Sequence, residues 1–288
     1  MARKAGALTK EETEGLRPVA RRRSKLREGD AMSETAPSIF ITGAASGIGL
    51  QTARLFARKG WRVGLADRNA AALDAVALEV GLNAKAFVVD VLDLRQLSSA
   101  LSAFLGPMGA LKALFNSAGI LEMKPFAETD VARLQAIVDI NVKGVINAIS
   151  AALPFLKGHG DARIVTMGSV SGIYGIPDLA VYSASKFAVR GLTEALNIEL
   201  ERDGVWVSDV IVAYVKTPMV EPAETKSKSV ELLGVNVTPE TVAEAVWNAV
   251  QGRQVHWFAT PADAAVAAKV DGMPWESRRD FVKSITGY

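Results

Sequence analysis

Cysteine is absent from the chain, and histidine occurs only twice, as His159 and His256. Disulfide bonds and cysteine-ligated zinc are therefore excluded, and two histidines are too few for a histidine-built metal site. The sequence also lacks an apolar run approaching the roughly 18 residues of a membrane span, and it lacks the apolar N-terminal core of a secretory signal. We expect a protein that holds no metal, does not enter a membrane and works in the cytoplasm.

Basic residues are in excess only at the N-terminus. Residues 1–31 contain nine Lys and Arg against five Asp and Glu, and because the whole chain has a net charge of +2, the remainder is slightly acidic. A surface that binds nucleic acid needs a basic face, so we do not expect nucleic acid as a partner. The polar tail has no strand-like run, which predicts a disordered extension over residues 1–37 without a function, and favours Met32 as the native start.

Short apolar runs alternate with segments of helical periodicity from residue 38 onward. This alternation is typical of βαβ units and a parallel sheet. The predicted strands are residues 39–41, 63–66, 86–89, 113–115, 164–167, 205–212 and 255–259. We therefore predict an α/β fold over residues 38–288: a single Rossmann-type, doubly wound domain with a parallel sheet of about seven strands and helices on both faces.

A glycine-rich segment, residues 42–49, lies between the first predicted strand and the first predicted helix. Glycine lets the backbone pass close to a pyrophosphate at a helix N-terminus. Such a turn alone also fits a tight strand-to-helix connection, but its place after the first strand favours a dinucleotide site. The expected contacts come from Gly43, Ser46, Gly47, Ile48 and Gly49.

Asp67 ends the second predicted strand, close to the roughly 20-residue spacing at which a carboxylate meets the adenosine ribose. Its charge would accept hydrogen bonds from the ribose hydroxyls and repel a 2′-phosphate, which favours NAD over NADP. The neighbouring Arg68 leaves NADP open, because a guanidinium could bind that phosphate. After the third strand, Asp90 and Val91 are expected at the adenine, with a helix-capping role as the alternative for Asp90.

Tyr182 and Lys186 are four residues apart in a segment of helical period, which places both side chains on one helix face. A phenol has a pKa of about 10 in water, so acid/base work near neutral pH needs a positive charge such as the Lys186 ammonium beside it. Ser169, at the end of an earlier strand, could hydrogen-bond a substrate oxygen in the same crevice. Alternatively, Ser169 caps the following segment, and the Tyr–Lys pair is a common surface pattern.

These motifs together resemble the short-chain dehydrogenases/reductases, from about residue 38 to residue 219. The resemblance is carried by the glycine loop, the segment 116–119, and the separate residues Asn141, Ser169, Tyr182 and Lys186. It implies a catalytic tetrad in which Asn141 anchors a water, Ser169 orients the carbonyl, Tyr182 transfers the proton, and Lys186 lowers the phenol pKa and holds the nicotinamide ribose. It also implies cofactor contacts from a further set of residues: Asn116, Ala118, Gly119, Val215 and Thr217.

The chain departs from the family pattern at Ser117, where the family usually has Asn, and at Val212-Ala213, which replaces an expected Pro-Gly beside the nicotinamide. The resemblance implies a homodimer or homotetramer that acts on a small alcohol or carbonyl substrate. A lid is expected over residues 218–237. Apolar residues are expected around the reacting carbon: Ile173, Tyr174, Ile176, Leu179 and Met219.

The expected function is hydride transfer between NAD(H) and a fairly apolar secondary alcohol or ketone. Two alternatives stay open. An NADP-dependent ketoreductase is indicated by Arg68, and a dinucleotide-binding protein with weak turnover is indicated by Val212-Ala213.

Overall fold

The computed structural model describes residues 36–106, 109–220 and 227–288, so most of the predicted N-terminal extension and part of the predicted lid lie outside the described residues. Seven strands form one sheet in the order β3-β2-β1-β4-β5-β6-β7, with every neighbouring pair parallel. They are β1 (Ser38–Thr42), β2 (Arg62–Asp67), β3 (Ala84–Val88), β4 (Ala113–Asn116), β5 (Ala162–Met167), β6 (Val205–Ile211) and β7 (His256–Phe258). The predicted Rossmann-type sheet is confirmed.

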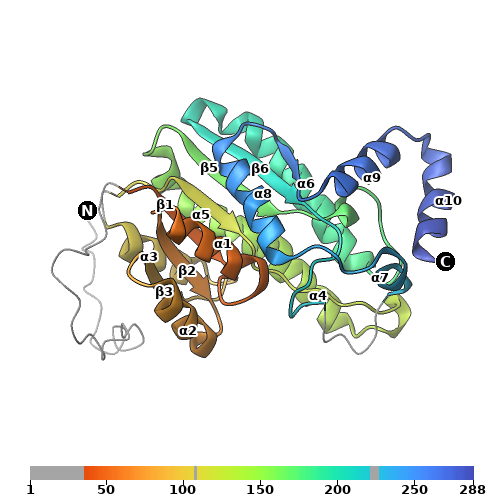
Figure 1. Ribbon diagram of the computed structural model, residues 1–288, viewed down its shortest axis with the longest axis horizontal. Coiled ribbons are helices and arrows are strands. Elements are labelled where there is room, and N and C mark those ends of the chain that lie inside the picture. Colours follow the sequence, from red (N-terminus) through yellow and green to blue (C-terminus); the bar gives the residue numbers. More distant parts are fainter. Residues whose placement is uncertain (1–35, 107–108, 221–226) are drawn as a thin grey trace, which may run out of the picture.

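Helices cover both faces of this sheet (Figure 1). One face packs against α1 (Gly47–Arg58), α2 (Ala70–Val80) and α8 (Pro239–Gln251), and the other against α3 (Leu94–Leu105), α5 (Gly144–Lys157) and α6 (Ala180–Glu199). The strand order reverses between β1 and β4, which are hydrogen-bonded neighbours. In a doubly wound sheet, this reversal opens a crevice at the carboxyl ends of the strands, where ligands bind.

The helices begin where polar side chains satisfy the free backbone N–H groups of their first turns. Asn69, Asp93 and Asp130 accept such hydrogen bonds at the starts of α2, α3 and α4 (Val131–Val138). Thr238 caps α8 with Pro239 in its first turn, and both are residue types that favour the start of a helix. Capping fixes where each helix starts and so positions the strand-to-helix loops that form the crevice.

A continuous helical stretch over Val131–Lys157 joins α4, a π-helical turn at Asp139–Lys143 and α5. Its mean hydropathy reaches 1.4, which is enough by length and composition to cross a membrane, but 44% of that window is buried inside the protein. The α5 residues Val145, Ala148 and Ala152 belong to the core beside β1 and β4. Packing on the sheet accounts for the apolar residues on the buried side of this stretch.

The C-terminal elements gather at the end of the molecule away from α2 and α3 (Figure 1). They are α7 (Lys228–Leu233), α9 (Pro261–Asp271) and α10 (Trp275–Thr286), and α10 packs against α7. The Tyr288 hydroxyl hydrogen-bonds the carboxylate of Asp178, and the Lys228 ammonium lies 5.1 Å from the centre of the Tyr288 ring. Tyr288 and Phe281 thus pack on their own chain, whereas Trp275 is 76% exposed.

Candidate active site

A solvent-connected cleft lies beside the carboxyl ends of β4, β5 and β6. It brings together residues from separate elements, including Ile48, Gly119, Ser169, Tyr182, Lys186, Ala213 and Thr217. Every strand that contributes is parallel to its neighbours, so these residues meet at one edge of the sheet.

The glycine loop between β1 and α1 is packed so tightly that two of its glycines leave no room for a side chain. Gly43 has a φ of +69°, and a Cβ added to it would lie 2.7 Å from the backbone nitrogen of Ala118. A Cβ on Gly49 would lie 2.1 Å from the carbonyl oxygen of Gly43. Ser46 stands at the N-cap of α1 without using its side chain as a cap, and it is exposed. The loop therefore presents bare backbone at a helix N-terminus, a surface that fits a pyrophosphate.

Asp67 ties the end of β2 to this loop. Its carboxylate accepts a hydrogen bond of 3.0 Å from the N–H of Ala45 and another of 3.0 Å from the N–H of Asn69. Each carboxylate oxygen keeps acceptor capacity for a further donor. Arg68 is exposed beside it.

Asp90 is exposed just beyond β3, and its carboxylate accepts a hydrogen bond of 2.9 Å from the N–H of Leu92. The helix cap of α3 is Asp93, so the capping alternative for Asp90 was wrong: a local turn uses this carboxylate instead. The carbonyl of Val91 accepts a hydrogen bond of 3.0 Å from Asn147. The expected adenine contacts of Asp90 and Val91 stay predictions.

The segment after β4 is held against the glycine loop. The N–H of Ala118 donates a 3.3 Å hydrogen bond to the Thr42 hydroxyl, and the Asn116 amide donates a 3.1 Å bond to Thr166. The Asn116 Oδ1 atom is buried and accepts no hydrogen bond from the described residues. Val215 is buried and Thr217 lies beside the loop, because a Cβ on Gly47 would come within 3.2 Å of Thr217 Cγ2.

Tyr182, near the start of α6, faces the cleft together with Ser169. Burial raises the pKa of Tyr182 to about 12, and hydrogen bonding with the Ser169 hydroxyl acts in the opposite direction. In the chain alone, the loss of hydration is the largest influence on the pKa of the phenol, and the expected lowering of this pKa by Lys186 stays a prediction. Ser169 also accepts a 3.2 Å hydrogen bond from the N–H of Ser171. It therefore caps the following segment and lines the cleft at the same time.

Lys186 lies one turn further along α6, with its ammonium 5.5 Å from the centre of the Tyr182 ring. The Nζ atom donates a 2.8 Å hydrogen bond to the carbonyl of Met167 at the end of β5. Burial lowers the pKa of Lys186 to about 8, and the charge of Asp209 opposes that change. The phenol and the ammonium are therefore adjacent at the inner end of the cleft.

Asn141 is buried in the π-helical turn between α4 and α5. Its side chain accepts a 2.8 Å hydrogen bond from the N–H of Ile120 and donates one of 3.0 Å to the carbonyl of Ile120. It also donates a 3.1 Å bond to the Ser185 hydroxyl on α6. Asn141 thus joins the segment after β4 to the helix that carries Tyr182. Sequence reasoning missed Ser185, although its place between Tyr182 and Lys186 was a usable signal.

At Val212-Ala213, where the family pattern has Pro-Gly, the backbone is held by Asp263, a residue that the sequence analysis did not single out. Val212 is buried in the core, and the N–H of Ala213 donates a 3.1 Å hydrogen bond to the carboxylate of Asp263. Asp263 is itself buried in the first turn of α9, where Thr260 donates a 2.7 Å bond to it. A carboxylate from the C-terminal region therefore holds the backbone beside the cleft at the point where the family pattern has Pro-Gly.

The apolar wall of the cleft includes Ile176, Leu179 and Met219, as expected. Ile173 and Tyr174 were placed wrongly, because they pack instead with Val270 of α9 in a separate apolar cluster. The cleft is also lined by Val220, Leu233 and Tyr214. The Tyr214 hydroxyl lies 2.7 Å from Ser229 Oγ of α7, so this unpredicted tyrosine links the segment after β6 to α7.

No group of three or more His, Cys, Asp or Glu side chains that could hold a metal ion occurs within residues 36–106, 109–220 and 227–288. The polar groups of the cleft are hydroxyls, one ammonium and backbone amides. This set of groups suits proton transfer and anion binding.

Comparison with known proteins agrees with this geometry. The family described as short chain dehydrogenase matches residues 37–228. A 3-oxoacyl-acyl-carrier-protein reductase of Thermotoga maritima is 33% identical over 72% of this chain and 87% of its own length. A cyclohexanol dehydrogenase of Acinetobacter is 32% identical over 72% of this chain and 84% of its own length.

Solved structures of short-chain dehydrogenases/reductases are also similar to this chain in fold. A 3-ketoacyl-acyl-carrier-protein reductase of Brucella melitensis, complexed with NADH, superposes with a TM-score of 0.70 at 27% identity, covering 78% of this chain and 97% of the other. A short chain dehydrogenase/reductase of Burkholderia phymatum in complex with NAD gives 0.73 at 26% identity, covering 82% and 94%. Fold and cleft together define a nucleotide-binding oxidoreductase. The chain belongs to the short-chain dehydrogenase/reductase family.

Proposed function

We propose that this protein transfers a hydride between NAD(H) and a secondary alcohol or ketone of fairly apolar character. The observation that carries the proposal is the convergence of Ser169, Tyr182 and Lys186 on one cleft that begins at a bare-backbone glycine loop. The cyclohexanol dehydrogenase relative and the neighbours solved with NADH and NAD support the same chemistry.

The residues present fit a nicotinamide dinucleotide. A side chain at Gly43 or Gly49 would collide with the backbone of Ala118 or of the loop itself, so the tight loop that offers its backbone to a pyrophosphate requires glycine at these positions. In the proposed arrangement the phosphates rest on residues 43–49, Asp67 and Arg68 flank the ribose, and Asp90, Val91, Asn116, Ala118 and Gly119 surround the adenine and the linker. Val215 and Thr217 hold the carboxamide end. The bound nicotinamide supplies the hydride acceptor or donor.

Tyr182 performs the proton transfer in the proposed mechanism. During alcohol oxidation, the phenolate oxygen takes the hydroxyl proton while the carbon–hydrogen bond breaks and its electron pair leaves as hydride, so that a ketone forms. The Ser169 hydroxyl hydrogen-bonds the substrate oxygen and holds it at the phenol. Lys186 stabilises the phenolate by its charge, and Asn141 connects this site to water through the π-helical turn. Ketone reduction follows the same steps in reverse.

The apolar wall restricts the substrate. Among the described residues that line the cleft, Lys186 is the charged side chain, and it lies beside Tyr182 rather than on the wall of Ile176, Leu179 and Met219. A charged group on the substrate would lose hydration there without gaining a partner. A neutral, fairly apolar substrate therefore fits best.

A screen of neutral secondary alcohols with NAD, and of the matching ketones with NADH, tests the proposal. We expect turnover that follows substrate apolarity, with carboxylate-bearing analogues at least tenfold worse in kcat/KM. Dinucleotide binding by calorimetry without turnover on any substrate would instead support the weak-turnover alternative indicated by Val212-Ala213.

The cofactor preference can be tested at Asp67. Removing its charge in Asp67→Asn should raise the ratio of kcat/KM with NADP to that with NAD by about tenfold or more, because repulsion of the 2′-phosphate is lost. The asparagine keeps an oxygen that can accept one of the two backbone hydrogen bonds. Asp74→Asn, a carboxylate change on the neighbouring helix, is the control and should leave the ratio unchanged. A wild-type preference for NADP would favour the ketoreductase alternative, with Arg68 as the phosphate ligand.

We also propose that the protein works in the cytoplasm as a homodimer or homotetramer that associates through α5 and α6. Large apolar side chains are exposed on and beside these helices, at Val138, Ile146 and Phe187. Light scattering of the whole chain tests the assembly, and a monomer at micromolar concentration would contradict it.

A further inference from the structure

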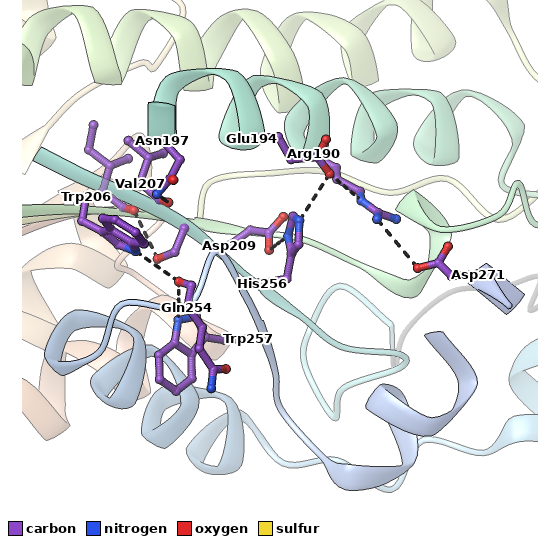
Figure 2. Close-up of polar contacts among 12 residues, drawn as sticks. Arg190, Glu194, Asn197, Trp206, Val207, Asp209, Gln254, His256, Trp257 and Asp271 are labelled. Carbon is purple, nitrogen blue, oxygen red and sulfur yellow. Dashed lines mark hydrogen bonds and ion pairs between the residues drawn. The ribbon is translucent and has the colours of Figure 1, made fainter. Parts of the chain in front are cut away.

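A cluster of charged side chains, which ends at the buried Asp209, lies between α6 and the β6–β7 edge of the sheet, outside the cleft (Figure 2). Asp209 of β6 is 1% exposed, and its Oδ1 lies 2.9 Å from Nδ1 of His256. The other ring nitrogen of His256 lies 3.3 Å from the carboxylate of Glu194. Arg190 hydrogen-bonds Glu194 at 3.0 Å and lies 3.8 Å from Asp271. Charges of opposite sign therefore alternate from Asp271 inward.

Asp209 is the innermost charged residue of this cluster, and one of its carboxylate oxygens has no hydrogen-bond partner among the described residues. This oxygen, Oδ2, is buried. Burial raises the pKa of Asp209, and the hydrogen bond from His256 opposes that change. A buried carboxylate is costly unless a positive charge faces it. His256 supplies one such partner at the edge of the sheet, and the inner side of Asp209 needs another.

Lys186 of α6 is a cation on which the charge of Asp209 acts, although no hydrogen bond or ion pair joins the two side chains within the described residues. Tyr182, Lys186, Arg190 and Glu194 follow one another at four-residue intervals, so they form one stripe along α6. Met167, whose carbonyl accepts the Lys186 hydrogen bond, pairs with Val210, the residue after Asp209. The backbone acceptor of the ammonium is neutral, so the nearest negative charge becomes important for keeping the ammonium charged. The charge of Asp209 raises the pKa of Lys186 against the effect of burial.

We propose that Asp209, held by His256 beneath α6, is a positioning residue that serves as the buried counter-charge of Lys186 and keeps its ammonium protonated for catalysis. The catalytic part of this statement rests on the proposed function. The charged groups that face the pair are His256 from β7, Arg190 and Glu194 from α6, and Asp271 at the end of α9 by way of Arg190. Asp209 touches neither the cleft lining nor the loop that would bind the dinucleotide.

The test is a titration of the whole, cofactor-free chain by NMR with lysine labelled at the ε-carbon. The Lys186 resonance is assigned by its disappearance in Lys186→Met. In the wild type we expect its midpoint near pH 8, in line with the pKa of about 8 for Lys186. Asp209→Asn should move that midpoint about one pH unit lower, a roughly tenfold change in the protonation constant, because the opposing charge is lost. An unchanged midpoint in folded Asp209→Asn would overturn the proposal.

Asp161→Asn is the matched control. This carboxylate lies just before β5, at the opposite end of the strand from Met167, and binds Lys112 and Arg163. Its removal also breaks ion pairs but should leave the Lys186 midpoint in place. A downward shift equal to that of Asp209→Asn would show a general structural effect and overturn the proposal.

The same coupling can be measured from the other partner if Asp209→Asn fails to fold. Coupling free energies are reciprocal, so Lys186→Met should move the titration of the Asp209 carboxyl carbon to higher pH by the same amount. No movement would contradict the proposal. Because both titrations use the cofactor-free protein, they stand apart from the turnover assays that test the proposed function.

Discussion

Tyr182→Phe will lower kcat for alcohol oxidation by about a thousandfold, the middle of the range expected when a general acid/base is removed. The change deletes the oxygen that takes the substrate proton and leaves the ring in its packed place beside Met123 and Leu179. NAD affinity should stay within about threefold of the wild type, because the glycine loop and Asp67 are untouched. Steady-state kinetics and calorimetric titration of NAD measure the two effects separately.

Tyr214→Phe is the control for this prediction, since Tyr214 is a second tyrosine of the same cleft and also loses only a hydroxyl. Its oxygen is hydrogen-bonded to Ser229 of α7, so we expect a change within about tenfold that falls mainly on KM. Retention of most of the wild-type kcat in Tyr182→Phe would rule out the proposed mechanism. An equal loss in both variants would indicate a packing effect instead.

Gly49→Ala will abolish measurable NAD binding, with an expected loss of at least about a hundredfold in affinity. Alanine is intrinsically better than glycine inside a helix by about 1 kcal/mol, so propensity alone would predict a gain in stability. The added Cβ would lie 2.1 Å from the carbonyl oxygen and 2.9 Å from the carbonyl carbon of Gly43. Backbone atoms cannot yield as a flexible side chain can, so the loop must shift away from the shape that fits a pyrophosphate.

Gly191→Ala provides the comparison, because Gly191 lies in α6 and an added Cβ there meets no atom within 4 Å. This control should bind NAD normally and melt at the same temperature as the wild type or slightly higher. Calorimetry with NAD and thermal unfolding of both variants measure the difference. Normal NAD affinity in a folded Gly49→Ala protein would mean that the dinucleotide does not lie on this loop.

The strands and the main helices could be predicted because each has a local cause in the sequence. The apolar run at 39–41 became β1, and Thr238 with Pro239 began α8 where the cap and the proline predicted. The glycine loop and the Tyr182–Lys186 pair could be predicted for the same reason. The conformational freedom of glycine and the four-residue spacing along a helix are both visible within a few consecutive residues of the sequence.

Other features could not be predicted because they depend on contacts between distant parts of the chain. Ala213 and Asp263 are 50 residues apart, yet their hydrogen bond holds the backbone beside the cleft. The sequence predicted Ile173 and Tyr174 in the substrate wall, but in the structure they pack against α9. The pKa of Tyr182 depends on how thoroughly the fold removes water from the phenol, and no sequence spacing reports that quantity.

The π-helical turn at Asp139–Lys143 has a consequence for protein engineering. The N–H of Gly144 bonds the carbonyl of Asp139, five residues back instead of four, so this turn contains one residue more than an α-helical turn. Deleting a single residue here would restore regular geometry and would rotate everything before it by roughly 100° relative to α5. Asn141 would then swing away from Ile120 and Ser185. Trimming this turn would therefore disconnect the segment after β4 from the helix that carries Tyr182.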